Sequence, residues 1–256
     1  MAKTDEVIAA ARQGFEAAFA EQHFYEKQTR DDSHLQALLG LLPVTQGMRV
    51  LDLGTGSGYL AFALAEQFPH AAVTGLDIAG RALAENRRRA EAAHMQNLRF
   101  ICSDGRALPF SAGEFDLVVS RYALHHFPEI GKSIAEISRV LTEDGYFFLS
   151  DPASDAADRG FLDAFMRVKP DGHVRFYSAA EWESLCAENG LFPVRAFQSS
   201  IRFPRRMQPE YAALIRRFGA EAAACCDLQI TAGSVYVTAQ VNNMLFCKSA
   251  STRRNT

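Results

Sequence analysis

Short apolar runs and segments with helical spacing alternate along the first 150 residues of the chain. The apolar runs predict five buried strands, at residues 48–53, 72–77, 98–102, 115–120 and 145–150. Apolar residues every three or four positions predict helices between them, at residues 59–68, 79–95 and 130–141. Near-continuous apolar strands that alternate with helices require a parallel sheet covered on both faces. Because such crossovers are right-handed, the pattern predicts an α/β fold with a doubly wound sheet.

The segments before the first strand also show helical spacing. Residues 1–30 and 35–42 carry apolar side chains on one helical face, so they predict an N-terminal helical cap over residues 1–45. The main domain is then expected to span residues 46–256. The 256 residues suffice for one large domain with such an addition.

The last hundred residues predict further elements at the other edge of the sheet. Ser178 has the position and chemistry of a helix N-cap. Apolar runs at residues 191–201 and 241–249 predict two more strands, paired antiparallel with each other, which bring the mostly parallel sheet to seven strands. Between these two strands, a helical insertion is predicted at about residues 203–240.

Composition narrows the function classes. A formal net charge of -3 offers no basic face for nucleic acid, and no apolar run reaches the ~18 residues of a membrane span. The start of the chain lacks the apolar core of a signal peptide. The five cysteines are odd in number and scattered, which is typical of reduced thiols in the cytoplasm. No group of residues has the spacing of a metal site.

A glycine-rich loop follows the first strand, in the run Val50-Leu51-Asp52-Leu53-Gly54-Thr55-Gly56-Ser57-Gly58. Glycine lets a ligand approach the backbone closely, so this strand-turn-helix predicts a nucleotide-cofactor loop. A P-loop would need lysine and Ser or Thr after the last glycine, where the chain has Tyr59 and Leu60. A dinucleotide loop would place its third glycine at position 59.

The acidic residue before the loop favours a cationic cofactor. Asp52 would repel a pyrophosphate but attract a positive group. S-adenosylmethionine carries a sulfonium and an ammonium and no phosphate, which fits this charge pattern.

Polar residues also follow three other predicted strands. Asp52, Asp77, Asp104 and Ser120 each lie at or just after the carboxyl end of a different strand. Ligands of doubly wound sheets bind beyond these ends, so the four side chains are expected to converge on one crevice.

Several motifs in combination resemble the class I S-adenosylmethionine-dependent methyltransferases. The glycine loop is similar to their first motif, and Gly75-Leu76-Asp77-Ile78 to their second. The segment from Cys102 to Phe110 is similar to the third acidic motif, and Phe115 to Phe127 and Arg139 to Gly145 resemble the segments around the next two strands. The resemblance covers about residues 45–150 and points to the small-molecule methyltransferases, including the ubiquinone/menaquinone C-methyltransferases. It implies a Rossmann-like fold.

The resemblance also implies roles for cofactor-binding residues. Asp52 would attract the ammonium of the cofactor, Asp77 would accept from its ribose hydroxyls, and Asp104 from the adenine amino group. The other implied cofactor residues are Gly54, Thr55, Gly56 and Gly58 near the methionine part, Ile78, Gly105 and Arg106 near the adenine, and Ser120 and Tyr122 beneath the methyl group. For Asp77 and Asp104 the alternatives are a helix cap and a turn former.

The implied reaction is in-line displacement at the sulfonium methyl, which releases S-adenosylhomocysteine. No metal is required. His125 or His126 is the candidate base for a small-molecule acceptor that must lose a proton. Two elements are expected to shape the acceptor pocket: the N-terminal cap and the insertion at about residues 203–240. Within the cap, Phe24 and Tyr25 could close over the cofactor.

Other interpretations remain open at this point. A nicotinamide-dependent oxidoreductase and a non-catalytic protein that binds S-adenosylmethionine are the two alternatives. His173 and Arg175 could contact an acidic acceptor or anchor their loop.

Overall fold

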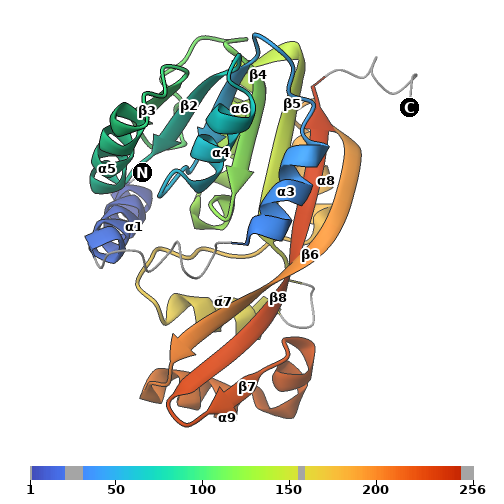
Figure 1. Ribbon diagram of the computed structural model, residues 1–256. Helices are drawn as coiled ribbons and strands as arrows, with labels where there is room; N and C mark the ends of the chain where they lie inside the picture. Colours follow the sequence, from blue (N-terminus) through green and yellow to red (C-terminus); the bar gives the residue numbers. More distant parts are fainter. Residues whose placement is uncertain (1, 21–30, 155–158, 249–256) are drawn as a thin grey trace.

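The computed structural model describes residues 2–20, 31–154 and 159–248. One mixed sheet in the order β3-β2-β1-β4-β5-β8-β6 forms its centre (Figure 1). Strands β1 to β5 are parallel, and β8 is antiparallel to both β5 and β6. These strands span Arg49–Leu53, Ala72–Asp77, Leu98–Cys102, Phe115–Arg121, Leu141–Pro152, Phe192–Arg206 (β6) and Ser234–Cys247 (β8). The predicted doubly wound α/β fold is confirmed, and its switch point lies between β1 and β4.

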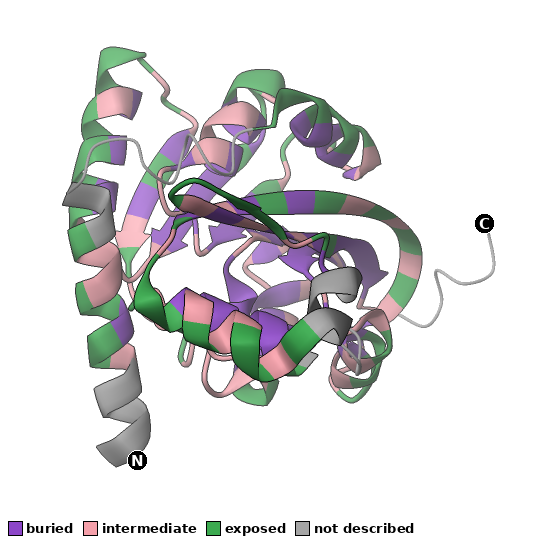
Figure 2. Cartoon of the chain, turned by 90° about the horizontal axis from the view of Figure 1, so that it is seen from below, coloured by how far each residue is buried: buried purple, intermediate pink, exposed green. Residues whose placement is uncertain are grey.

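Helices cover both faces of the sheet because successive strand residues point to opposite sides. One face packs against α3 (Asp32–Leu41), α4 (Tyr59–Gln67) and α5 (Gly80–Ala92). The other packs against α6 (Ile130–Val140) and α8 (Ala179–Ala187). In Figure 2 the buried residues accordingly concentrate on the strands and on the inward sides of the helices.

Helix α8 begins where the sequence predicts. Ser178 accepts a hydrogen bond from the backbone N–H of Glu181, and the Glu181 side chain accepts one from the backbone N–H of Ser178. This reciprocal capping box satisfies two N–H groups that the first helical turn leaves without partners.

The sheet contains one strand more than predicted. The three-residue β7 (Gln229–Thr231) pairs with β8, so the sheet has eight strands. Strands β6 and β8 also extend into the predicted insertion and pair from Phe192 opposite Cys247 to Arg206 opposite Ser234. The segment 203–240 is therefore a hairpin as well as a helix.

A third apolar core lies at the far end of this hairpin, below the main sheet in Figure 1. It joins the distal halves of β6 and β8 to α7 (Arg159–Arg167), which the sequence did not predict, and to α9 (Pro209–Cys225). Helix α9 is interrupted at Gly219, whose backbone is not helical.

The N-terminal helix α1 (Ala2–Ala20) packs on two distant segments. Glu16 accepts a hydrogen bond from the backbone N–H of Arg81 at the start of α5. On the other side, a Cβ atom at Gly14 would lie 2.1 Å from the carbonyl oxygen of Pro170. This close approach fixes the helix across the carboxyl ends of the parallel strands.

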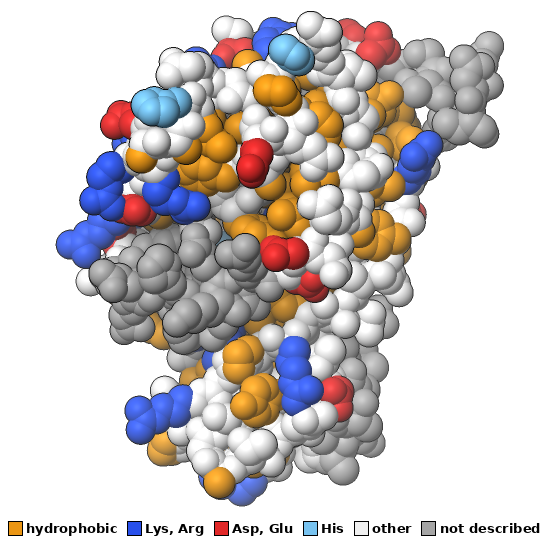
Figure 3. Space-filling model, viewed as in Figure 1, with side chains coloured by type: hydrophobic (Ala, Val, Ile, Leu, Met, Phe, Trp, Pro, Cys, Tyr) orange, Lys and Arg blue, Asp and Glu red, His pale blue; other side chains and the backbone are white. Residues whose placement is uncertain are grey.

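Within the described residues, no helix is long and apolar enough to cross a membrane. On the face drawn in Figure 3, basic side chains lie in separate groups with acidic ones among them.

Candidate active site

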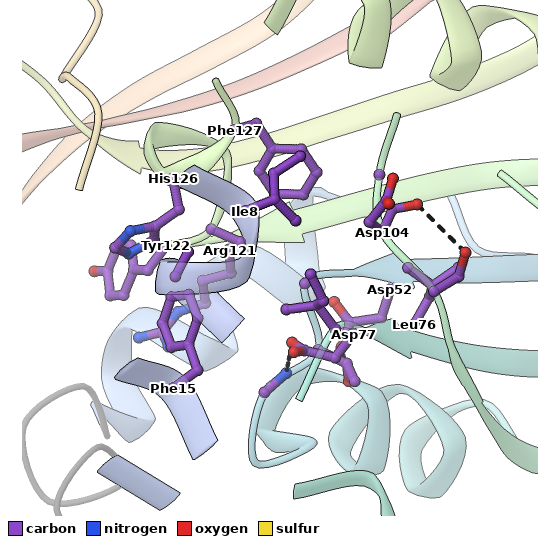
Figure 4. Close-up of a pocket in the computed structure, with 18 of the residues that line it drawn as sticks. Ile8, Phe15, Asp52, Leu76, Asp77, Asp104, Arg121, Tyr122, His126 and Phe127 are labelled. Atoms are coloured by element: carbon purple, nitrogen blue, oxygen red, sulfur yellow. Dashed lines mark hydrogen bonds between the residues drawn. The ribbon is translucent and has the colours of Figure 1, made fainter. Parts of the chain in front are cut away.

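A cavity opens at the carboxyl ends of β1, β2, β3 and β4, where the sequence predicts it (Figure 4). Helix α1 contributes part of its wall, so the cavity lies between the sheet and the N-terminal helix. Of the fourteen residues proposed from the sequence, eleven line it: Asp52, Gly54, Thr55, Gly56, Asp77, Ile78, Asp104, Gly105, Arg106, Tyr122 and His126. Gly58, Ser120 and His125 do not belong to this lining.

The glycine loop is held against β2 by backbone hydrogen bonds. The N–H groups of Gly54 and Thr55 both donate to the carbonyl of Leu76, at 2.8 and 3.0 Å. Gly54 has a φ of 76°, in the left-handed region that favours glycine. A Cβ atom at this position would lie 2.3 Å from the Cβ atom of Ala123, so the loop also packs tightly against the segment after β4.

Asp77 connects the glycine loop to the start of α5. Its two carboxylate oxygens accept from the backbone N–H groups of Gly56 and Ala79, at 2.8 and 2.9 Å. The helix-capping alternative is thus realised in part, since Ala79 is the N-cap residue of α5. Burial raises the pKa of Asp77, and these backbone donors counteract that rise. The carboxylate also lines the cavity, so capping does not remove it from the site.

Asp52 is a buried carboxyl at the end of β1. Its side chain accepts a hydrogen bond of 2.6 Å from the Thr55 hydroxyl. Burial raises its pKa to about 7, and the nearby Asp77 carboxylate adds to the effect. The group is therefore poised to ionise near neutral pH, and a cation in the cavity would favour the ionised form.

Asp104 and Arg106 pair at the β3 end of the cavity. The Arg106 guanidinium lies 3.2 Å from the carboxylate, which also accepts from the Arg106 backbone N–H. Burial works to raise the pKa of Asp104, but the hydrogen bonds from Arg106 outweigh it and the pKa is lowered. Phe127 closes this end, because a Cβ atom at Gly105 would lie 1.9 Å from its ring.

Gly58 and Ser120 support the cavity from outside its wall. Gly58, with a φ of 80°, is the N-cap residue of α4. The Ser120 hydroxyl is buried and donates to the carbonyl of Leu53, which ties β4 to β1. The placement of Ser120 differs from the expected one on the cavity surface, because its side chain points between the two strands.

The two adjacent histidines occupy different environments. His125 is held away from the cavity by Asp151 on β5, which accepts from its backbone N–H and lies 2.5 Å from Nδ1. Burial lowers the pKa of His125 and raises that of Asp151, because it disfavours the charged form of each group. His126 does line the cavity, and burial lowers its pKa to about 3. Only His126 is therefore placed to meet an acceptor.

The loop after α7 carries two side chains for which the sequence left two interpretations. His173 lies 2.9 Å from the Asp163 carboxylate, and Arg175 pairs with Glu181 of the α8 capping box. Neither residue lines the cavity. Both contacts are those of loop anchors.

Several lining residues were not proposed from the sequence. They include Ile8, Ala11 and Phe15 of α1, together with Tyr59, Arg121 and Phe127. The α1 residues had an apolar helical pattern but no chemical signal, whereas Arg121 directly precedes Tyr122 at a strand end and could have been found there. Phe24 and Tyr25 lie outside the described residues.

The polar lining fits S-adenosylmethionine. The carboxylates of Asp52, Asp77 and Asp104 lie at the ends of three adjacent strands, and the pKa of Asp52 is about 7. Beside them is the glycine loop, whose backbone a ligand can approach closely. A cofactor with two positive groups, a ribose diol and no phosphate is complementary to this set. In the described part of the chain, no group of three or more His, Cys, Asp or Glu side chains is arranged to hold a metal ion.

Comparisons with known proteins agree with this geometry. A family described as a methyltransferase domain matches residues 44–192. The uncharacterized methyltransferase YcgJ of Bacillus subtilis is 30% identical over 79% of this chain and 78% of its own length. A demethylmenaquinone methyltransferase of Thermus thermophilus is 38% identical over 48% of this chain and 56% of its own.

The fold has a close counterpart among solved structures. The crystal structure of YcgJ superimposes with a TM-score of 0.72 at 23% identity, over 86% of this chain and 99% of that one. These matches favour a methyltransferase over the nicotinamide-dependent alternative. The chain belongs to the class I S-adenosylmethionine-dependent methyltransferases.

Proposed function

We propose that this cavity binds S-adenosylmethionine and that the enzyme transfers the methyl group to a small-molecule acceptor. The observation that carries the proposal is the convergence of Asp52, Asp77 and Asp104 around the glycine loop, within one cavity. The Thermus thermophilus relative, which is named for a quinone substrate, supports an acceptor of small size.

The proposed cofactor residues follow the strand order. Each carboxylate oxygen of Asp77 can accept more than one hydrogen bond, so it can bind the ribose hydroxyls while it holds Gly56 and Ala79. Asp104, with the backbone of Gly105 and Arg106, and the side chain of Ile78 would contact the adenine. The methionine part would lie along Gly54, Thr55 and Gly56, with its ammonium toward Asp52.

The acceptor end is assigned to the opposite side of the cavity, around Tyr122 and His126. Phe15 of α1 packs there against His126, with 4.9 Å between ring centroids (Figure 4). This supports the proposal that the cap of residues 1–45 shapes the acceptor pocket. No described residue of 203–240 lines the cavity, so the described part of that insertion adds nothing to this wall.

When bound, S-adenosylmethionine supplies a methyl group already activated by its sulfonium. The contribution of the protein is therefore alignment and exclusion of water, which Phe15 and Phe127 serve as apolar walls. Burial lowers the pKa of His126 to about 3, so its imidazole is neutral at pH 7 but only a weak base in the empty cavity. Its proposed role as a base therefore requires that the bound acceptor raise this pKa.

Binding to two cofactors tests the proposal. S-adenosylhomocysteine is expected to bind in the micromolar range or tighter by calorimetry, with NAD at least about a hundredfold weaker, because Asp52 disfavours a pyrophosphate. Incubation with tritiated S-adenosylmethionine and a panel of quinols, phenols and amines then searches for the acceptor. Tighter binding of NAD would contradict the assignment.

His126→Gln should lose transfer to hydroxyl acceptors and retain cofactor binding.

Cofactor affinity is expected to depend on pH through Asp52. S-adenosylmethionine favours the ionised carboxyl, so its affinity should rise by up to about tenfold per pH unit until pH reaches about 7, and then level off. The free energy of unfolding changes in the opposite sense. Because the pKa of Asp52 is raised in the folded chain, the folded chain holds this proton more tightly than the unfolded chain does, and the free energy of unfolding falls as pH rises toward about 7. Calorimetry across this range should show a flat profile for Asp52→Asn, which can still accept from Thr55. A wild-type profile without slope would refute the role of Asp52.

A further inference from the structure

A second imidazole, that of His173 in the loop after α7, lies next to His126. The two rings meet edge to face, with 6.2 Å between their centroids. Among the described residues, the Nδ1 atoms of both rings are buried and neither has a hydrogen-bond partner. The His126 side chain also lines the cavity, at the same end as Phe15 in Figure 4. Buried polar atoms are nearly always hydrogen-bonded, directly or through water, so this pair of nitrogens requires an explanation.

The other nitrogen of His173 is bound to a carboxylate. The side chain of His173 is fully buried, and its Nε2 lies 2.9 Å from Oδ1 of Asp163 on α7. The same oxygen accepts from the backbone N–H of Phe176, also at 2.9 Å, so the carboxylate is held in place. Because a carboxylate can only accept, Nε2 carries the hydrogen. In the neutral form of His173, Nδ1 is then an acceptor.

Two contacts hold the loop after α7 against the turn after β4 and against α1. The backbone N–H of Val174 donates to the carbonyl of His125, the residue before His126, at 3.0 Å. A Cβ atom at Gly172 would lie 2.4 Å from the Cβ atom of Ala11 on α1. The contact that anchors this loop therefore also fixes the separation of the two imidazoles.

The groups around His126 act on its charge in opposite directions. Burial is the largest influence on the pKa of His126 and lowers it, and the imidazoles of His125 and His173 lower it further. The carboxylates of Asp171 and Asp151 act through space and raise it. A hydrogen-bond acceptor at Nδ1 would favour the imidazolium in addition to these carboxylates.

We propose that Asp163 and His173 are positioning residues for His126, linked to it by a water molecule between the two Nδ1 atoms. This inference rests on the proposed function, in which His126 is the base. Water bridges polar groups that are too far apart for a direct hydrogen bond. With His173 as the final acceptor, His126 holds its hydrogen on Nδ1 and presents the lone pair of Nε2 to the methyl acceptor. A hydroxyl of that acceptor gives its proton to Nε2, and the imidazolium keeps its Nδ1–H bond.

Histidine tautomers test this arrangement and do not require the methyl acceptor. Two-bond ¹H–¹⁵N correlation spectra at pH 7, on protein with ¹⁵N-labelled histidine, distinguish the two tautomers of each ring. The expected result is Nδ1–H for His126 and Nε2–H for His173, with the signals assigned from His126→Gln and His173→Gln. An Nε2–H tautomer at His126 in the wild-type protein would overturn the inference.

Asp163→Asn tests the role of the carboxylate. The amide oxygen can still accept from Phe176, but the amide NH₂ group donates to Nε2 of His173, so His173 moves its hydrogen to Nδ1. The bridging water then turns, and His126 is expected to switch to the Nε2–H tautomer. If Asp163→Asn does not fold, His173→Phe should cause the same switch at His126, because it keeps an aromatic ring and removes the acceptor.

Asp171→Ala is the control for the carboxylate that acts on His126 from the same loop. It removes that charge and leaves Asp163 and His173 in place, so the Nδ1–H tautomer should persist. Loss of this tautomer in Asp171→Ala, with retention in Asp163→Asn and His173→Phe, would make Asp171 the partner of His126 and refute the proposed pair. A protein with the expected tautomers that does not bind S-adenosylhomocysteine would instead contradict the proposed function.

Discussion

Replacing Asp77 by alanine is expected to weaken S-adenosylhomocysteine binding by at least tenfold. Hydrogen bonds to a charged group contribute about 1.5–3 kcal/mol each, and Asp77 is the proposed acceptor for both ribose hydroxyls. The same change leaves the N–H groups of Gly56 and Ala79 without their acceptor, so the free energy of unfolding should fall by about 1–3 kcal/mol. Calorimetry and urea denaturation measure the two effects.

Asp116→Ala is the matched control for this experiment. Asp116 also accepts from a backbone N–H, that of Arg49 at 2.8 Å, but it lies at the opposite end of β4 from the cavity. It should lose stability and keep its cofactor affinity. If Asp77→Ala retains full affinity, or if both variants lose it alike, Asp77 does not bind the ribose.

Gly54→Ala is expected to abolish measurable cofactor binding and to destabilise the fold. The left-handed backbone alone costs an alanine about 1–2 kcal/mol. The contact of 2.3 Å with Ala123 adds an overpacking cost of about 1–3 kcal/mol, because two backbone segments must separate. That shift would pull the loop from Leu76 and deform the cavity wall.

Gly47→Ala isolates the backbone effect from the contact. Gly47 has a φ of 82°, close to that of Gly54, but a Cβ atom there would meet nothing within 4 Å. Urea denaturation of Gly47→Ala should therefore show only the backbone cost of about 1–2 kcal/mol, and cofactor binding should be unchanged. Equal destabilisation by the two substitutions would mean that the glycine loop can move away from Ala123 at no cost in the free energy of unfolding.

The parallel strands and their shared crevice were predictable because each signal is local. A strand buried on both faces is apolar along its length, and the polar residues at or just after the ends of β1, β2 and β3 face the crevice, whereas Ser120 at the end of β4 does not. The extension of β6 was not predicted because Pro204 interrupts the pattern, although it pairs opposite Tyr236 within the strand. The alternation Val235, Val237, Ala239 was a usable signal for the partner strand.

The site was predictable in its carboxylates but not in the choice between its histidines. His125 and His126 lie in a short 3₁₀ turn, η1 (Leu124–His126), where neighbouring side chains point in different directions. Which one faces the cavity is decided by Asp151, which is close in space and distant in sequence. The cover that α1 provides depends likewise on contacts with distant segments, at Arg81 and Pro170.

The position of β8 has a consequence for the order of folding. This strand lies between β5 and β6, so β6 has no neighbour in the sheet until β8 has been synthesised. The third core needs the same strand, since it supplies Val235, Val237 and Val241. During translation, the five parallel strands can associate while β5 presents an open edge, a state prone to pairing with other chains. Chaperone protection of that edge would then matter most in the interval before β8 leaves the ribosome.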